Sequence, residues 1–368
     1  MNQPSTPRAY LHIGAPKTGT TYLQAVLSAN RDALATAGVL YPGRLDAAHF
    51  LAAQDLRGLT FAGHTDARVP GAWDRTADRV RRWRGPSAIV SHELLAGCDR
   101  EAITTAVESL SPREVHVVFT ARDLARQIPA MWQESVKNGR TAALDAYTRR
   151  LTRDGTGRVG AMLEQSLDAA RVLSRWSDVV TPERIHVVTV SGTPAPPAQL
   201  WTRFCRAAGL DPACCDTDVE QRNASMGLAE TELVRQLNQR LGDRFDWPTY
   251  ERLVKQWLAK QVLAARRPSA PSQLPADLRP WVDARSAEIT ATLSAAGYDV
   301  VGSLDDLVPS WDDHQDRRTS ATPPPGDALD ASLDAMVALL DEVARLQARA
   351  DRSPVRQLRR VVRARLTR

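Results

Sequence analysis

Apolar positions in the first half of the chain form short runs, separated by segments whose apolar residues recur at helical spacing. The runs predict buried strands at residues 9–13, 87–91, 114–121 and 184–190. After the first run, Tyr22, Leu23 and Val26 begin a repeat that predicts a helix over residues 20–36. Runs without polar alternation suit a parallel sheet that is covered on both faces. The pattern therefore predicts an α/β fold with a P-loop-like, doubly wound parallel sheet flanked by helices.

The second half of the chain has the periodicity of helices. They are predicted at residues 159–176, 198–208, 229–241, 250–265 and 280–296. A stretch rich in proline and polar residues then has the composition of a linker, and an amphipathic helix follows it. The predicted organisation is a large domain over residues 1–312, a linker over 313–328, and a C-terminal helix with a basic tail over 329–368.

The net charge of +5 is distributed unevenly along the chain. The last residues, DRSPVRQLRRVVRARLTR, contain seven arginines and one aspartate, which sum to +6. Residues 1–350 therefore carry 5 − 6 = −1. A nearly neutral body argues against a broad nucleic-acid-binding surface, and we expect no nucleic-acid partner.

The basic tail has an apolar stripe of its own. Val355, Leu358, Val362 and Leu366 recur at three- and four-residue steps, with arginines between them. Such a helix can lie in a membrane interface with its arginines toward anionic headgroups, so we expect a peripheral membrane contact. The alternative is that the tail packs in a helical oligomer together with residues 329–346.

Cysteine content and hydropathy indicate the compartment. The four cysteines lack the paired spacing of zinc ligands, and we expect reduced thiols. The N-terminus has no apolar signal segment, and no apolar run approaches the roughly 20 residues that span a bilayer. We therefore expect a cytoplasmic protein, with any membrane contact at the inner face.

The stretch GAPKTGTTYLQ, residues 14–24, lies between the first predicted strand and the first predicted helix. A glycine-rich turn there presents backbone N–H groups and a helix N-terminus to an anion. Gly14 and Gly19 have the spacing of a Walker A loop, but Thr20 stands at the lysine position and Lys17 stands inside the loop. No strand ends in the metal-binding aspartate that a magnesium-dependent NTPase needs.

The segment PKTGTT resembles the 5′-phosphosulfate loop of sulfotransferases that use 3′-phosphoadenosine 5′-phosphosulfate (PAPS). The resemblance implies a P-loop sulfotransferase fold of the bacterial branch, with PAPS as donor, PAP as product and no metal. It also implies that the loop binds the 5′-phosphosulfate, through Pro16, Lys17, Thr18, Gly19, Thr20 and Thr21. Lys17 is further expected to stabilise the leaving phosphate oxygen, a catalytic role.

A second segment, VVFTARDLARQIPAMWQE, matches the family's 3′-phosphate site. Arg122 follows a predicted strand, as the family's arginine does, but Ala130 stands where the family has a serine. Arg126 or Gln127, about one turn beyond Arg122, would then supply the missing donor. In the polar stretch QRNASMG, the resemblance further suggests donor-binding roles for Arg222, Asn223 and Ser225, whose alternative role is helix capping.

Two residues compete for the role of general base. Glu93, in the stretch IVSHELLAG, lies at a strand end that corresponds to the catalytic position of the cytosolic sulfotransferases. His49, in AAHF, resembles a His-Phe pair in the carbohydrate-modifying branch and has a suitable intrinsic pKa. Turn capping is the structural alternative for Glu93, and packing is the alternative for His49.

These features together predict an enzyme, a PAPS-dependent sulfotransferase. The expected acceptor is a hydroxyl, or an amine, of a small molecule, a carbohydrate or a glycolipid. The alternatives are a P-loop kinase acting on a small metabolite, and a nucleotide-binding scaffold without catalysis. Magnesium-dependent ATP binding would indicate the kinase, and turnover of PAPS would exclude the scaffold.

Overall fold

The computed structural model describes residues 6–60, 63, 65–152, 160, 163–192, 196–219, 226–311 and 323–351. Arg222, Asn223, Ser225 and the basic tail beyond residue 351 lie outside the described residues. The chain forms two compact units. Unit 1 comprises Met1–Ser135, Ala142–Asn223 and Ser272–Ala321, and unit 2 comprises Val136–Thr141, Ala224–Pro271 and Thr322–Arg368.

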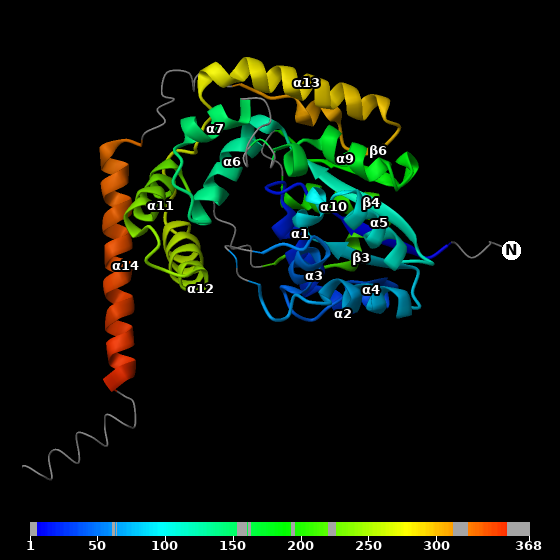
Figure 1. Ribbon diagram of the computed structural model, residues 1–368, viewed down its shortest axis with the longest axis horizontal. Coiled ribbons are helices and arrows are strands. Elements are labelled where there is room, and N and C mark those ends of the chain that lie inside the picture. The colour runs from blue at the N-terminus through cyan, green and yellow to red at the C-terminus, as the bar shows by residue number, and fades with distance from the viewer. Residues whose placement is uncertain are drawn as a thin grey trace, which may run out of the picture. The chain divides into compact units, whose positions relative to one another are not determined.

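Unit 1 is built on a single parallel sheet (Figure 1). Its strands are β1 (Arg8–His12), β2 (Val39–Leu40), β3 (Ser87–Ser91), β4 (Glu114–Ala121), β5 (Ile185–Thr189) and β6 (Asp299–Val301). They are ordered β2-β3-β1-β4-β5-β6, and every pair is parallel. Arg8 of β1 lies opposite Ser87 on one side and Glu114 on the other. The predicted α/β fold class is thereby confirmed.

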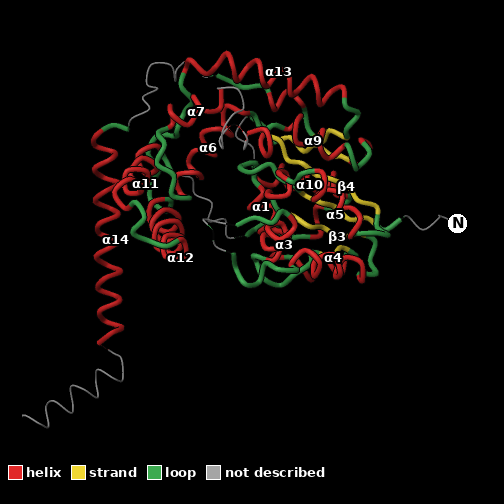
Figure 2. The backbone as a smooth tube through the Cα atoms, in the orientation of Figure 1, coloured by secondary structure: helices red, strands yellow, loops and turns green. Residues whose placement is uncertain are grey.

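Helices flank this sheet (Figure 2). In unit 1 they are α1 (Thr20–Ala29), α2 (Arg31–Thr36), α3 (Ala48–Leu56), α4 (Ala72–Arg82), α5 (Arg100–Ser109), α7 (Leu144–Thr152), α9 (Ala169–Ser177), α10 (Pro197–Ala208) and α13 (Arg279–Ala295), and α6 (Leu124–Lys137) starts in unit 1 and ends in unit 2. No helix among the described residues is both long and apolar enough to cross a bilayer.

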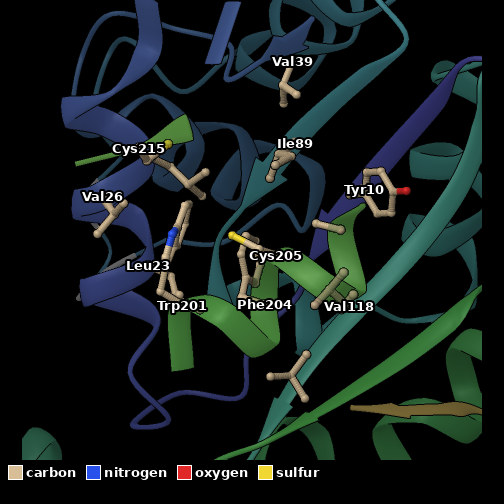
Figure 3. Close-up of a cluster of buried hydrophobic side chains, with 14 of the residues drawn as sticks. Tyr10, Leu23, Val26, Val39, Ile89, Val118, Trp201, Phe204, Cys205 and Cys215 are labelled. Atoms are coloured by element: carbon tan, nitrogen blue, oxygen red, sulfur yellow. The ribbon is translucent and has the colours of Figure 1, made fainter. Parts of the chain in front are cut away.

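The core between the sheet and two of these helices contains large side chains (Figure 3). Leu23 of α1 and the Trp201 and Phe204 pair of α10 are almost completely buried there. Ile89 and Val118 supply the sheet side of the same cluster. Burial of apolar area is worth about 25 cal/mol per Å², so this cluster anchors α1, and with it the loop before α1, on the sheet.

The predicted helix over residues 20–36 is divided by Asn30. Its backbone N–H and its side-chain Nδ2 both donate to the Val26 carbonyl, at 3.1 and 2.9 Å, and close the last turn of α1. Its side chain also donates to the Asp216 carbonyl and accepts from the Asp216 N–H, at 2.8 and 2.9 Å. Asn30 therefore ends α1 while it bonds Asp216, which is far away in the sequence, and α2 starts at the next residue, Arg31.

Unit 2 contains the helices α11 (Leu228–Leu241), α12 (Trp247–Tyr250) and α14 (Pro325–Asp351), with a π-helical segment over Glu251–Leu263. Tyr250 and Asn238 hydrogen-bond at 2.7 Å in its interior. The predicted large domain over residues 1–312 includes α11 and α12, whereas these two helices belong to the same compact unit as α14. The last helix begins at Pro325, inside the segment predicted as a linker.

Candidate active site

The loop between β1 and α1 has a backbone that requires glycine at two positions. Gly14 has φ 113° and Gly19 has φ 91°, both in the region that L side chains rarely adopt. A Cβ atom on Gly19 would lie 2.4 Å from Cδ2 of Leu200. Lys17, between them, has φ 66°. The loop is therefore held in a tight conformation that turns the backbone toward the start of α1.

Thr120, near the end of β4, holds this loop in place through hydrogen bonds to its backbone. Its N–H and its hydroxyl both donate to the Gly14 carbonyl, at 2.5 and 2.8 Å, and its carbonyl accepts from the Ala15 N–H at 2.8 Å. The Thr18 hydroxyl is fully buried and bonds the Ala15 carbonyl and the Thr120 hydroxyl, both at 2.5 Å. Gln127 of α6 adds a bond from Nε2 to the Pro16 carbonyl at 2.8 Å. The loop is thus organised before any ligand arrives.

The start of α1 is open to an anion. Gly19 is the N-cap and has no side chain to accept from the first N–H groups of the helix. Those N–H groups and the helix dipole favour negative charge. Lys17 is about one-third exposed and places its Nζ 3.4 Å from Oε2 of Glu134. The loop thus combines backbone donors with one adjacent ammonium group.

A cavity of about 350 Å³, here called the arginine cavity, opens beside the loop. Its lining includes Thr18, Gly19, Arg122, Arg126, Gln199, Leu200 and Arg203. The Arg122 guanidinium donates from Nη1 to the Lys17 carbonyl at 3.2 Å, which ties the end of β4 to the loop. Nε of Arg122 and Nη2 of Arg126 are buried and have no hydrogen-bond partner among the described residues.

Electrostatics in the arginine cavity favour an anion. Burial lowers the pKa of Arg122, and the neighbouring Arg126 charge lowers it further, while Asp123 acts in the opposite direction. Asp123 pairs with Nε of Arg126, and the Ser191 and Gly192 carbonyls each accept from Arg126 Nη1 at 3.0 Å. A bound anion would relieve the repulsion between the two cations.

Arg203 is a cavity residue that the sequence analysis missed. It lies on α10 and donates from Nη1 to the Thr189 carbonyl and to Oδ2 of Asp306, both at 2.7 Å. No motif marks it, because it reaches the cavity from a helix far along the chain. At Ala130 the structure has no hydroxyl to replace the family's serine, and Gln127 is committed to the Pro16 carbonyl. Arg126 and Arg203 are the other two arginines that line this cavity.

A second cavity, of about 710 Å³ and here called the histidine cavity, lies on the other side of β1. Its lining includes Thr21, Gln24, Arg31, Tyr41, Asp46, His49, Ser91, His92 and Asp218. It reaches the first turn of α1 through Thr21, and the ends of β2 and β3 through Tyr41 and Ser91. Basic, acidic and hydroxyl groups share this lining, so it offers several kinds of polar contact to a ligand.

His49 is held with both ring nitrogens occupied. Its Nε2 donates to the Pro42 carbonyl at 2.6 Å, and its Nδ1 accepts from the Ser91 N–H at 2.9 Å. The ring is almost completely buried, and burial lowers its pKa to about 4 despite the Pro42 bond. In this arrangement the neutral imidazole has no free lone pair for an incoming proton.

Glu93 lies directly after His92 and beside the loop. A Cβ atom on Gly14 would be 3.2 Å from the Glu93 Cα, which shows how closely the two backbones approach. Oε2 of Glu93 accepts from Nε2 of Gln24 at 3.3 Å. Burial raises the pKa of Glu93, whereas hydrogen bonds from the Glu93 backbone N–H and Gln24, together with His92 when its ring is protonated, lower it, and the net direction is downward. The net direction favours the ionised carboxylate.

His92 is a hydrogen-bond donor through Nε2. Its Nδ1 accepts from the Leu94 N–H at 3.1 Å, and burial lowers its pKa, so the neutral ring carries its proton on Nε2. His12, at the end of β1, is fully buried and bonds the Ser91 hydroxyl through Nδ1 at 2.7 Å. Burial lowers the pKa of His12 to about 4. Carboxylates are the remaining proton acceptors in this region: Asp46 and Asp218 line the histidine cavity, and Glu93 accepts a hydrogen bond from Gln24 of that lining.

The described residues contain no cluster of three or more His, Cys, Asp or Glu side chains arranged to hold a metal ion. No family model matches the chain, and no curated protein matches it. Among solved structures, the chain is similar to a crystal structure of a sulfotransferase from Alicyclobacillus acidocaldarius, with 18% identity and a TM-score of 0.32. That similarity covers 68% of this chain and 100% of the other. Similarity at this level establishes neither a family nor an activity.

Proposed function

We propose that this protein is a PAPS-dependent sulfotransferase that transfers a sulfuryl group to a hydroxyl or amine of a small-molecule, carbohydrate or glycolipid acceptor. The observation that carries the proposal is Arg122. It lines the same cavity as Thr18 and Gly19, so a second anion subsite adjoins the phosphate-binding loop. A donor with phosphate groups at both the 5′ and 3′ positions of its ribose needs two such subsites, whereas ATP needs one.

The donor would lie with its 5′-phosphosulfate on the loop and its 3′-phosphate in the arginine cavity. Backbone N–H groups at the start of α1 and the Lys17 ammonium would bind the first group. The guanidinium groups of Arg122 and Arg126, which line the cavity, would bind the second. The Arg122 bond to the Lys17 carbonyl sets the relative position of the two subsites.

The acceptor would enter through the histidine cavity and reach the donor at Thr21 and Gln24. Its oxygen attacks sulfur, the bond from sulfur to the 5′-phosphate oxygen breaks, and PAP leaves. Glu93 takes the acceptor proton, and Lys17 stabilises the charge that develops on the leaving oxygen. Gln24, which donates to Glu93 and lines the cavity, would keep the carboxylate oriented.

Isothermal titration calorimetry with PAP and with ADP, both in EDTA, tests the donor assignment without knowledge of the acceptor. PAP should bind more tightly than ADP, because only PAP fills both anion subsites. Equal affinities, or ATP binding that requires magnesium, would overturn the proposal and favour a kinase. PAP formation from PAPS in the presence of a panel of hydroxyl acceptors then distinguishes an enzyme from a binding scaffold.

A further inference from the structure

Helix α14 of unit 2 has two apolar faces of different character. The inner face consists of small side chains and packs on α11 and on the π-helical segment Glu251–Leu263. Ala331 is completely buried there, and Ala335 and Ala338 are half-buried. Arg266 donates from Nε to Oδ2 of Asp334 at 2.9 Å and holds the helix along this side. The inner face therefore already has its partner.

The outer face carries large apolar side chains that are exposed. They are Leu329, Leu333, Met336, Val337, Leu339, Leu340, Val343 and Leu346, of which Leu340 is the most exposed at 68%. Monomeric proteins seldom leave a continuous apolar stripe of this kind in water. Figure 1 shows α14 as one uninterrupted helix, so the stripe runs along a straight surface.

The spacing on this outer face is that of a coiled coil. Successive members of the series Leu329, Leu333, Met336, Leu340 and Val343 are separated by four, three, four and three residues. A heptad repeat with this alternation packs against another helix by inserting side chains between those of its partner. The pattern therefore indicates that the partner is a helix with the same heptad repeat.

We propose that α14 pairs in antiparallel orientation with α14 of a second copy of this chain. With the two helices centred on Ala338, Met336 of one lies level with Leu340 of the other, and Leu333 lies level with Val343. Val337 and Leu339 lie at the heptad positions that flank this stripe, one on each side. In the same register Val337 lies near Val337 of the other helix and Leu339 near Leu339, so both flanks of the central layer are apolar. One stripe is thus complementary to itself when the chain direction is reversed.

The helix dipoles favour the reversed direction over a parallel pair, because antiparallel helices place opposite partial charges side by side. The charged side chains are spread along the helix, with Asp327, Asp330 and Asp334 in the first half and Asp341, Glu342, Arg345, Arg349 and Asp351 in the second. The antiparallel direction therefore rests on the self-complementary stripe and on the dipoles.

The same charges argue against a lipid surface as the partner. Residues 325–351 contain six acidic and two basic side chains, a sum of −4. Helices that lie on anionic membranes have basic residues on the polar face. A second copy therefore fits the outer face better than a membrane does, whatever the basic tail beyond residue 351 binds.

Sedimentation velocity of the full-length protein tests the pairing. The wild-type chain should sediment as a dimer of twice the 40.4 kDa chain mass. Leu340→Asp should be a monomer, because it places a carboxylate in the central layer. Ala348→Asp, which adds the same charge at an exposed position outside the stripe, should remain a dimer. A monomeric wild type, or a dimer in which Leu340→Asp has no effect, would overturn the proposal.

Disulfide trapping tests the direction of the helices. A mixture of Leu333→Cys and Val343→Cys chains should form a covalent dimer on mild oxidation, and neither variant alone should exceed the wild type, whose own cysteines set the background. Covalent dimers from each variant alone would indicate a parallel pair and overturn the antiparallel register. A monomer that pellets with phosphatidylcholine–phosphatidylserine vesicles, and loses this with Leu340→Asp, would identify a membrane as the partner instead.

Discussion

The arginine cavity and the histidine cavity open at the same edge of one sheet, on opposite sides of β1, yet they offer different chemistry. The first is lined by the guanidinium groups of Arg122, Arg126 and Arg203 beside the loop. The second has imidazoles, hydroxyls and charges of both signs, with Glu93 bonded to one of its lining residues. A single strand end therefore separates a place suited to a multiply charged anion from a place suited to an uncharged or mixed ligand.

The order of the strands explains this division. β4 and β5 continue the sheet on one side of β1. Arg122 directly follows β4 and Thr189 ends β5, and both line the arginine cavity. β3 and β2 continue it on the other side and end next to His92 and Tyr41, which line the histidine cavity. In open α/β sheets, ligands bind outside the carboxyl ends of the strands where the winding changes direction. Here the winding changes direction at β1, the strand that leads into the loop.

Removing the carboxylate on the histidine side should have the largest effect. Glu93→Gln should lower kcat for sulfuryl transfer by roughly a hundredfold to ten-thousandfold, the scale of a lost general base. PAP affinity, measured by calorimetry, should stay near that of the wild type, because Glu93 is not in the arginine cavity. His49→Gln, which can keep both hydrogen bonds of the ring, is the matched test of the rival base. An active Glu93→Gln protein with an inactive His49→Gln protein would reverse the assignment.

The second prediction concerns the loop between the two cavities. Lys17→Met should lower kcat by at least about a hundredfold, because the ammonium is expected to stabilise charge that develops only in the transition state. Steady-state kinetics separate this role from simple binding. An unchanged kcat with a raised KM would show that Lys17 holds the donor equally in the ground state.

On the arginine side, the effect should appear in binding rather than in chemistry. Arg122→Ala should reduce the preference for PAP over ADP by about 1.5–3 kcal/mol, the range of a charge-assisted hydrogen bond. Competitive calorimetry in EDTA measures this preference directly. Arg100→Ala, which removes a highly exposed arginine of α5, is the control and should leave the preference intact. If both variants behave alike, the arginine cavity is not the 3′-phosphate site.

The smallest expected effect is on stability and concerns the histidines. His12 and His49 have pKa values lowered by burial to about 4, whereas unfolded histidine titrates near 6.5. Between these values the unfolded chain binds more protons, so stability falls as pH falls below 6.5. Acidification from pH 7 to 5 should cost roughly 2 kcal/mol per histidine.

Urea unfolding at the two pH values measures this slope. His49→Gln should reduce the slope by the contribution of one histidine, because the side chain at this position then no longer titrates, while His12, His92 and His116, whose pKa values burial also lowers, still do. A variant with the full wild-type slope would show that the His49 ring is not held neutral in the folded protein. Unfolding at pH 7 serves as the control for any loss of packing that the substitution causes.

Much of the fold could be predicted from local pattern. The strand prediction at 9–13 lies one residue from β1, and those at 87–91 and 114–121 match β3 and β4. β2 and β6 were missed because two and three residues are too short to show a pattern. The helix over residues 20–36 was predicted without its break, since Asn30 ends α1 through Asp216, which lies far away in the sequence.

The sequence by itself located the glycine-rich loop between β1 and α1 and placed Arg122 directly after β4, because strand, glycine turn and helix N-terminus are contiguous. Only the tertiary structure decided that Arg203 joins Arg122, that Gln24 holds Glu93, and that both nitrogens of His49 are occupied. These relations depend on strand order and on helix packing. The β3 and β4 ends reach β1 from roughly eighty to a hundred residues away, and no periodicity in a sequence specifies which strands will be neighbours.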